Sequence, residues 1–155
     1  MQKAFSLVEL SIVLVILGLL TGGILAGQSL IRAAELRSIA NEYNRYITAV
    51  QSFRDKYFAL PGDMNNAVQF WGAASCPGTL GATATSLVTC NGDGDGAVDW
   101  ASGSSTGSYE NFRFWQQLVN SGHIEGSYSG VAYSGGERDA RPSINVPVGK
   151  LSNSG

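Results

Sequence analysis

A short acidic, glycine-rich segment has the residue types and the spacing of a calcium-binding loop. It reads NGDGDGAVD, from Asn91 to Asp99. Counted from Asn91, oxygen side chains fall at positions 1, 3, 5 and 9, glycine at position 6 and the Ala97 carbonyl at position 7, as in an EF-hand-type loop. The four side chains are those of Asn91, Asp93, Asp95 and Asp99. Because calcium prefers hard oxygen ligands on a tight turn, the segment predicts a calcium site.

This loop lacks one ligand of a full EF-hand. Position 12 normally carries a bidentate glutamate, and Ser102 stands there instead. A later acid such as Glu110 could complete the ligand shell. The alternative interpretation is a solvated acidic turn without a metal, because Asp-Gly pairs also form hairpin turns.

Another carboxylate lies inside an apolar run. Glu9 is part of KAFSLVELSIVLVILGLL, which starts at residue 3. A charge within a membrane is costly and is usually paired, although a group near the end of a span can reach the interface instead. If the chain were cut between Ala4 and Phe5, the new α-amine would lie about one helical turn from Glu9. Between staggered subunits, the Glu9 of one could pair with the amine of the next and set the axial register of a helix bundle.

The residue composition offers little for catalysis or for nucleic acid. There is a single histidine, His123, and the chain contains no HExxH, CxxC or phosphate-loop motif, so we expect no enzyme. The net charge is −2 with a pI of about 5.3, and lysine and arginine form no block, so we expect no nucleic-acid partner. Cys76 and Cys90 are the two cysteines. A disulfide is predicted if this part lies outside the cytoplasm, and two buried free thiols are the alternative.

The N-terminal third has the pattern of a membrane anchor that continues as an amphipathic helix. Leu10 to Ile31 carries no charge and exceeds the roughly 20 residues that a span needs. A secretory signal peptide fits less well, because only MQKA precedes the run, although TGGILAG resembles a cleavage region. Lys3, before the span, favours a cytoplasmic N-terminus. Arg32 and Arg37, which follow the span closely, weaken this prediction of orientation. Apolar residues then recur every three or four positions, at Leu36, Ile39, Tyr43, Tyr46, Ile47, Val50, Phe53 and Tyr57.

We therefore predict one helix from about Phe5 to about Tyr57, ended by Pro61 and Gly62. Beyond it, we expect a short helix around Asn65–Trp71. A further helix, with Phe112, Trp115, Leu118 and Val119 on its packed face, should end at Gly122. IEGSYSGVAYSGG and RPSINVPVGKL have the pattern of short strands and turns. The polar end SNSG is consistent with a truncated sequence or a disordered tail.

The stretch FSLVELSIVLVILGLL resembles the N-terminal signature of type IV pilins and type II secretion pseudopilins. Members of this family carry a short basic leader, a phenylalanine after the cut and a glutamate at the fifth mature position. The resemblance implies a leader of residues 1–4, cleavage between Ala4 and Phe5 by a prepilin peptidase, N-methylation of Phe5, and Glu9 as the register glutamate. Ala4 stands where the family usually has glycine.

The same resemblance implies an α+β, pilin-like fold. Residues 5–31 would be the transmembrane and assembly helix, residues 32–57 its amphipathic continuation, and residues 58–155 a small head with an antiparallel sheet and long loops. The expected location is the bacterial inner membrane, single-pass, with the N-terminus in the cytoplasm and the head in the periplasm, and a filament or the cell surface after assembly. Several pseudopilins also hold calcium in the head, which favours the calcium hypothesis.

Two function classes follow from these features. The first is a structural subunit of a pilus-like filament, foremost a type II secretion-type pseudopilin, whose partners are the inner membrane, other copies and pilin-like subunits. Two GxxxG pairs, Gly18 with Gly22 and Gly23 with Gly27, would let its helices approach closely. The second class is a membrane-anchored calcium-binding or adhesive surface protein that does not polymerise. Replacement of Glu9 distinguishes them, because only the first class needs this carboxylate for assembly.

Overall fold

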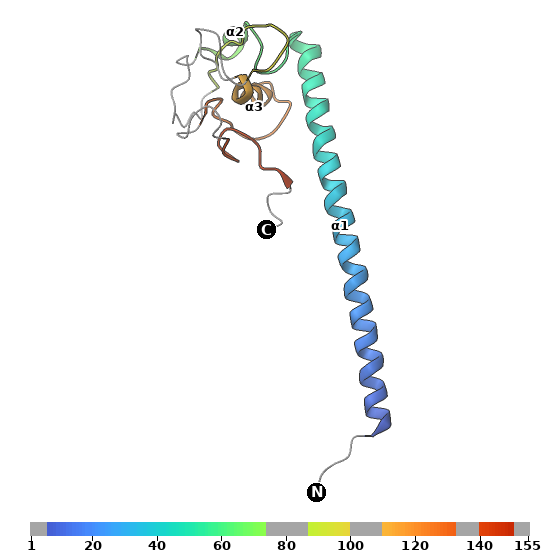
Figure 1. Ribbon diagram of the computed structural model, residues 1–155. Coiled ribbons are helices and arrows are strands. Elements are labelled where there is room, and N and C mark those ends of the chain that lie inside the picture. The colour runs from blue at the N-terminus through green and yellow to red at the C-terminus, as the bar shows by residue number, and fades with distance from the viewer. Residues whose placement is uncertain (1–5, 74–86, 100–109, 133–139, 151–155) are drawn as a thin grey trace. The chain divides into compact units, whose positions relative to one another are not determined.

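The computed structural model describes residues 6–73, 87–99, 110–132 and 140–150 (Figure 1). These ranges contain the helices α1 (Leu7–Tyr57), α2 (Ala67–Trp71) and α3 (Glu110–Asn120). The chain divides into two compact units, Met1–Asn41 and Glu42–Gly155, and α1 contributes to both. The long helix predicted from the sequence is confirmed, and its observed end at Tyr57 agrees with the expected one.

The first unit consists of the N-terminal part of α1, whose apolar side chains are exposed along its length. They include Leu10, Leu14, Ile16, Leu20, Ile24 and Ile31. By length and composition, α1 is a helix that could cross a membrane. An exposed apolar surface of this extent is typical of helices that pack in lipid or against other helices.

In the second unit, the C-terminal part of α1 contributes one face to a small core. Phe53 is fully buried and Ala49 nearly so, while Tyr46, Val50 and Tyr57 pack against the same cluster. The core is completed by Met64, Ala67, Leu118 and Ile124. Aromatic rings make close contacts there, including an edge-to-face pair of Tyr46 with Trp115 at 5.2 Å between centroids. The predicted apolar stripe of α1 therefore packs against the core from Tyr46 onward.

A turn with an unusual backbone follows α1. Phe58 donates its N–H to the Arg54 carbonyl with φ of 55°, a left-handed conformation that glycine usually supplies at a helix C-terminus. Gly62 has φ of 89°, and its N–H donates to the buried Gln117 side chain at 2.7 Å. A Cβ at Gly62 would lie 2.5 Å from the Glu110 carbonyl oxygen, so only glycine fits here. This turn places Asp63 beside the N-terminus of α3.

The remaining predicted elements have mixed outcomes. The helix expected to end at Gly122 is α3, and Gly122 has the positive φ, 78°, that a helix C-cap favours. The short helix expected near residue 65 is α2. The predicted antiparallel sheet is not found: over residues 6–73, 87–99, 110–132 and 140–150, the only β-pairing consists of isolated parallel bridges, Ala73 with Thr89 and Pro142 with Val146.

Candidate functional site

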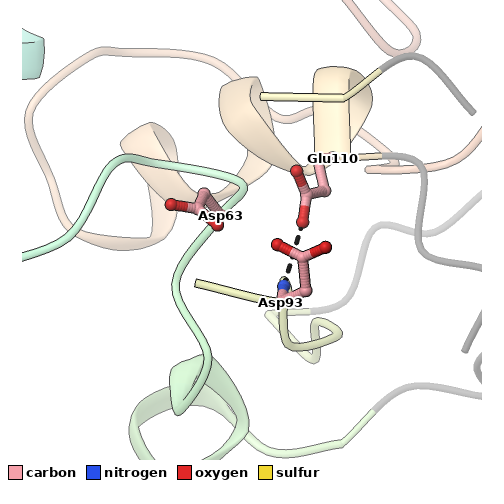
Figure 2. Close-up of side chains that lie close together, drawn as sticks. All are labelled: Asp63, Asp93 and Glu110. Atoms are coloured by element: carbon pink, nitrogen blue, oxygen red, sulfur yellow. Dashed lines mark hydrogen bonds between the residues drawn. The ribbon is translucent and has the colours of Figure 1, made fainter. Parts of the chain in front are cut away.

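The best-defined polar site of the second unit forms where the turn after α1, the 91–99 loop and the first turn of α3 meet. Carboxylate oxygens of Asp63, Asp93 and Glu110 lie within 4.8 Å of one another there (Figure 2). Asp63 and Glu110 are 3% exposed, whereas Asp93 is exposed. Figure 2 shows the three residues arriving on three separate segments of the chain, with Glu110 over Asp93.

The two buried carboxylates hold the loop through its backbone. Asp63 Oδ1 accepts the N–H groups of Gly94 and Asp95, at 2.7 and 3.1 Å, and its Oδ2 accepts that of Gly96 at 3.0 Å. Glu110 spans the loop, because Oε1 accepts the Asp93 N–H and Oε2 the Asp99 N–H, both at 3.0 Å. A buried carboxylate needs such donors, and these five bonds fix the loop conformation.

Burial and like charge make the ionised state of this cluster costly. Burial raises the pKa of the Asp63 carboxyl, the N–H groups of Gly96 and Gly94 oppose the rise, and the charges of Asp95 and Asp93 add to it. Burial likewise raises the pKa of Glu110, against the N–H groups of Asp99 and Asp93. Within the described ranges no basic side chain forms an ion pair with this cluster. A proton or a cation would offset the repulsion.

Buried polar side chains of α3 hold the surrounding loops. Gln117 accepts the Gly62 N–H and donates to the Cys90 carbonyl at 3.2 Å, so one side chain ties the turn after α1 to the residue that precedes the 91–99 loop. Gln116 donates to the carbonyls of Val88 and Ser129 and accepts from Arg113 at 2.9 Å. Burial lowers the pKa of Arg113 to about 10. The face of α3 that supports the site is therefore polar.

The sequence-predicted ligands are only partly brought together. Oxygens of Asp93, Asp95 and Asp99 lie within 4.8 Å of one another in an exposed group, which shares Asp93 with the buried group. Asn91 is used differently, because its Oδ1 accepts the Val68 N–H of α2 at 2.9 Å. The Ala97 N–H donates to Asp95 Oδ1, which tightens the turn. Glu110, the later acid considered from the sequence, lies close to Asp93 in the buried group and is not part of the exposed group.

Sequence reasoning missed Asp63. Asp63 belongs to LPGD, the segment whose proline and glycine predict the end of the long helix, and such a segment by itself does not predict a site. The residue is distant in sequence from the 91–99 loop, and no local spacing connects the two. Its place after a Pro-Gly turn, where a side chain can be turned inward, was the available signal.

Of the two cysteines predicted to form a disulfide, the structure describes Cys90 only. Cys90 is 1% exposed, and no described cysteine is free. Cys76 lies outside the residues that the structure describes, as do Ala4, Phe5 and Ser102. The pairing of Cys76 with Cys90 and the cut between Ala4 and Phe5 stay predictions.

At the other end of the chain, Glu9 caps its own helix. Glu9 Oε2 accepts the Ser6 N–H at 3.0 Å, and the Ser6 hydroxyl accepts the Val8 N–H at 3.3 Å. This resembles a capping box, in which a serine before the helix pairs with a glutamate in its first turn, except that the serine hydroxyl accepts the N–H of Val8 and not that of Glu9. The S-x-x-E pattern before an apolar run, Ser6 to Glu9, is the sequence signal for this cap.

The four glycines of the GxxxG pairs have open space around them. A Cβ added at Gly18, Gly22, Gly23 or Gly27 would meet nothing within 4 Å. The described fold of this chain therefore gives no packing reason for glycine at these positions. A close approach by another helix would give one.

Comparison with known proteins matches the N-terminus only. Residues 1–25 match the family model described as the prokaryotic N-terminal methylation motif. No curated protein and no solved structure matches the chain. The matched residues include Glu9 and the start of the apolar surface of α1.

Proposed function

We propose that this chain is a structural subunit of a type II secretion-type pseudopilus. Its methylation motif supports a place among type IV pilin-like and pseudopilin subunits. One observation carries the proposal: the matched motif continues without a break into a 51-residue helix whose first part is apolar and exposed. A motif that directs cleavage and methylation, on a helix that needs lipid or other helices, fits a subunit stored in a membrane and then polymerised. The proposed role is structural rather than catalytic.

The N-terminal hydrogen bonds are compatible with two successive environments for Glu9. In the single chain, Glu9 bonds to Ser6 and stabilises the start of α1. After cleavage before Phe5, a neighbouring α-amine would offer a cationic donor, and a charge-assisted bond of that kind is stronger than one to a neutral N–H. Assembly would then exchange a bond within the subunit for one between subunits, and the glycines of the span would allow the helices to approach.

The proposed route rests on the motif and on the topology expected from the sequence. A prepilin peptidase would remove Met1–Ala4 on the cytoplasmic side of the bacterial inner membrane, and the head would lie in the periplasm. The partners would be other copies and related pilin-like subunits. A membrane-anchored surface protein that never polymerises is the competing function, and the following experiment separates the two.

Glu9→Ala tests the proposal in cells. We expect the variant to insert in the membrane but to be lost from sheared filaments, because a neutral side chain cannot pair with the neighbouring amine. Glu35→Ala is the matched control, since Glu35 is an exposed carboxylate on the same helix. The measurement is the amount of the chain in sheared filaments relative to that in membranes. Incorporation of Glu9→Ala at the level of Glu35→Ala would contradict the filament function.

We also propose that the head binds calcium. Supporting this, three acids of the 91–99 loop lie together, and one of them, Asp93, also approaches two buried carboxylates. Asp63 and Glu110 would serve where the loop lacks its position-12 glutamate. The carboxylates of Asp63 and Glu110 have lone pairs that their hydrogen bonds to the loop do not use. All the acids of the two groups offer hard oxygens, the ligands that calcium prefers. The ion would offset the repulsion between the carboxylates.

Calorimetry of the full chain in detergent tests this site. We expect calcium binding at millimolar ion or below, and Asp93→Asn should weaken it about ten-fold or more, because Asp93 belongs to both acidic groups. Glu125→Gln is the control, since that carboxylate is 94% exposed and pairs with Arg45. No heat of binding at millimolar calcium, or equal affinities of the two variants, would contradict the proposal. A Cys76–Cys90 disulfide is the further proposal for an oxidising periplasm.

A further inference from the structure

We propose that Asn91–Gly92 is a deamidation site which the closed 91–99 loop suppresses and which opening of the loop exposes to reaction. The inference needs neither calcium nor a filament. It starts from an Asn-Gly pair, which is chemically labile because glycine leaves the backbone nitrogen open to attack. The sequence contains this pair once, at the first position of the acidic loop.

The reaction consumes only water. The deprotonated Gly92 nitrogen attacks the Asn91 side-chain carbonyl carbon, a C–N bond forms, and ammonia leaves to give a five-membered succinimide. Water then opens the ring at either carbonyl. The product is aspartate with the normal backbone or isoaspartate with the chain routed through the side chain. Nothing is oxidised or reduced, and the chain gains one negative charge.

Both reacting groups are held by hydrogen bonds in the folded chain. The Gly92 N–H, whose nitrogen is the nucleophile, donates to the Met64 carbonyl at 2.9 Å. The Asn91 Oδ1, on the carbon to be attacked, accepts the Val68 N–H at 2.9 Å. The two bonds run to different segments of the chain. Ring closure must break or distort at least one of them, so the closed loop opposes reaction.

Close packing adds a second restraint. A Cβ built at Gly92 would lie 2.5 Å from the Asp63 backbone, so the Gly92 peptide has no free space on that side. Asp63 also holds the following residues through the N–H groups of Gly94, Asp95 and Gly96. A change of the Gly92 backbone toward a succinimide therefore disturbs its packing against Asp63, the residue that also holds the rest of the loop. Opening of this loop becomes the step that admits the reaction.

The two products would have different effects on the fold. An aspartate at position 91 keeps an oxygen for the Val68 N–H, so the loop can close again with one more charge beside Asp93. Isoaspartate inserts an extra backbone carbon next to Gly92, where packing against Asp63 leaves no room. That product should hold the loop open. Deamidation would thus convert a closed acidic loop into a mixture of a more acidic loop and an open one.

The test follows Asn91 by peptide mass spectrometry in the full chain, kept in detergent and calcium-free buffer at mildly alkaline pH. Wild type, Asp63→Asn and the control Glu125→Gln are incubated side by side, and wild type is also incubated across a urea series. Conversion to aspartate and isoaspartate is scored from the mass gain and the retention time. Asn120, which precedes Ser121 at the end of α3, is an internal reference.

We expect slow conversion in wild type and Glu125→Gln, and conversion at least about ten-fold faster in Asp63→Asn, which loses part of the loop's hydrogen bonding. In wild type, the rate should rise with urea below the global unfolding midpoint. Native conversion as fast as that of the unfolded chain, or no conversion even when unfolded, would overturn the proposal. If Asp63→Asn does not fold, the urea series on wild type decides. A wild-type conversion rate that rises only with global unfolding would then overturn the proposal.

Discussion

At the scale of single residues, the carboxylates Glu9, Asp63 and Glu110 act mainly as acceptors for backbone N–H groups. Glu9 accepts the Ser6 N–H before α1, and Asp63 and Glu110 together accept five N–H groups of the acidic loop. Each group can also take part in binding, to a neighbouring amine or to a cation. The same atoms therefore support the fold of the single chain and the proposed function.

His123 is a titrating group that we expect to make stability depend on pH. Burial lowers its pKa, and the nearby Lys56 lowers it further. The unfolded chain then binds a proton more readily than the folded one. Stability contributed by the neutral side chain is present above the ordinary pKa of 6.5 and is lost as the pH falls from there through the lowered folded value.

His123→Gln tests this expectation. The urea midpoint of the wild-type chain in detergent should fall more steeply between neutral pH and pH about 5 than that of the variant, because glutamine does not titrate. The difference between the two profiles removes the contribution of the carboxylates, which titrate in both. Parallel profiles would show that His123 does not contribute.

Among the elements, α3 does the most to position the acidic site. Its first turn supplies Glu110, and Gln117 two turns later accepts the Gly62 N–H and bonds the Cys90 carbonyl. The close approach of Gly62 to the Glu110 carbonyl fixes the turn that carries Asp63. The spacing between the turn after α1 and the helix α3 is therefore set at Gly62, a position without a side chain.

Two glycines with similar backbone angles give a matched test of that contact. Gly62 and Gly122 have φ of 89° and 78°, but a Cβ at Gly62 would collide with the backbone, whereas one at Gly122 would meet nothing within 4 Å. Gly122→Ala should cost about 1 kcal/mol of unfolding free energy for its φ alone. Gly62→Ala should cost roughly 2 kcal/mol more because of the overlap. Equal costs, measured by chemical denaturation, would contradict the contact.

Sequence periodicity predicted α1 and α3 because each has apolar residues on a helical repeat. It did not predict that α3 would also bury Glu110, Arg113, Gln116 and Gln117. Burial of polar side chains depends on loop carbonyls and N–H groups that come from elsewhere in the chain, and no local pattern reports them. Similarly, Leu36 and Tyr43 fit the apolar stripe of α1 but are 68% and 66% exposed.

At the scale of the whole molecule, each unit presents a different kind of surface. The first exposes apolar side chains and glycines with space beside them, and the second has its own core and an acidic loop. The spacing in the sequence singled out the loop acids and left Glu110 as one possible later acid, but it could not single out Asp63, because a long-range approach brings that residue to the loop. The proposed function rests mainly on the N-terminal motif.

The most direct test of the filament-subunit account is the mass of the mature N-terminus, measured on chain purified from membranes of cells that contain a prepilin peptidase. The account predicts loss of Met1–Ala4 and a mature chain that begins with N-methylated Phe5. Replacing Ala4 with glycine should leave the same N-terminus. A chain that keeps Met1, or one cut after the apolar run near TGGILAG, would contradict the account.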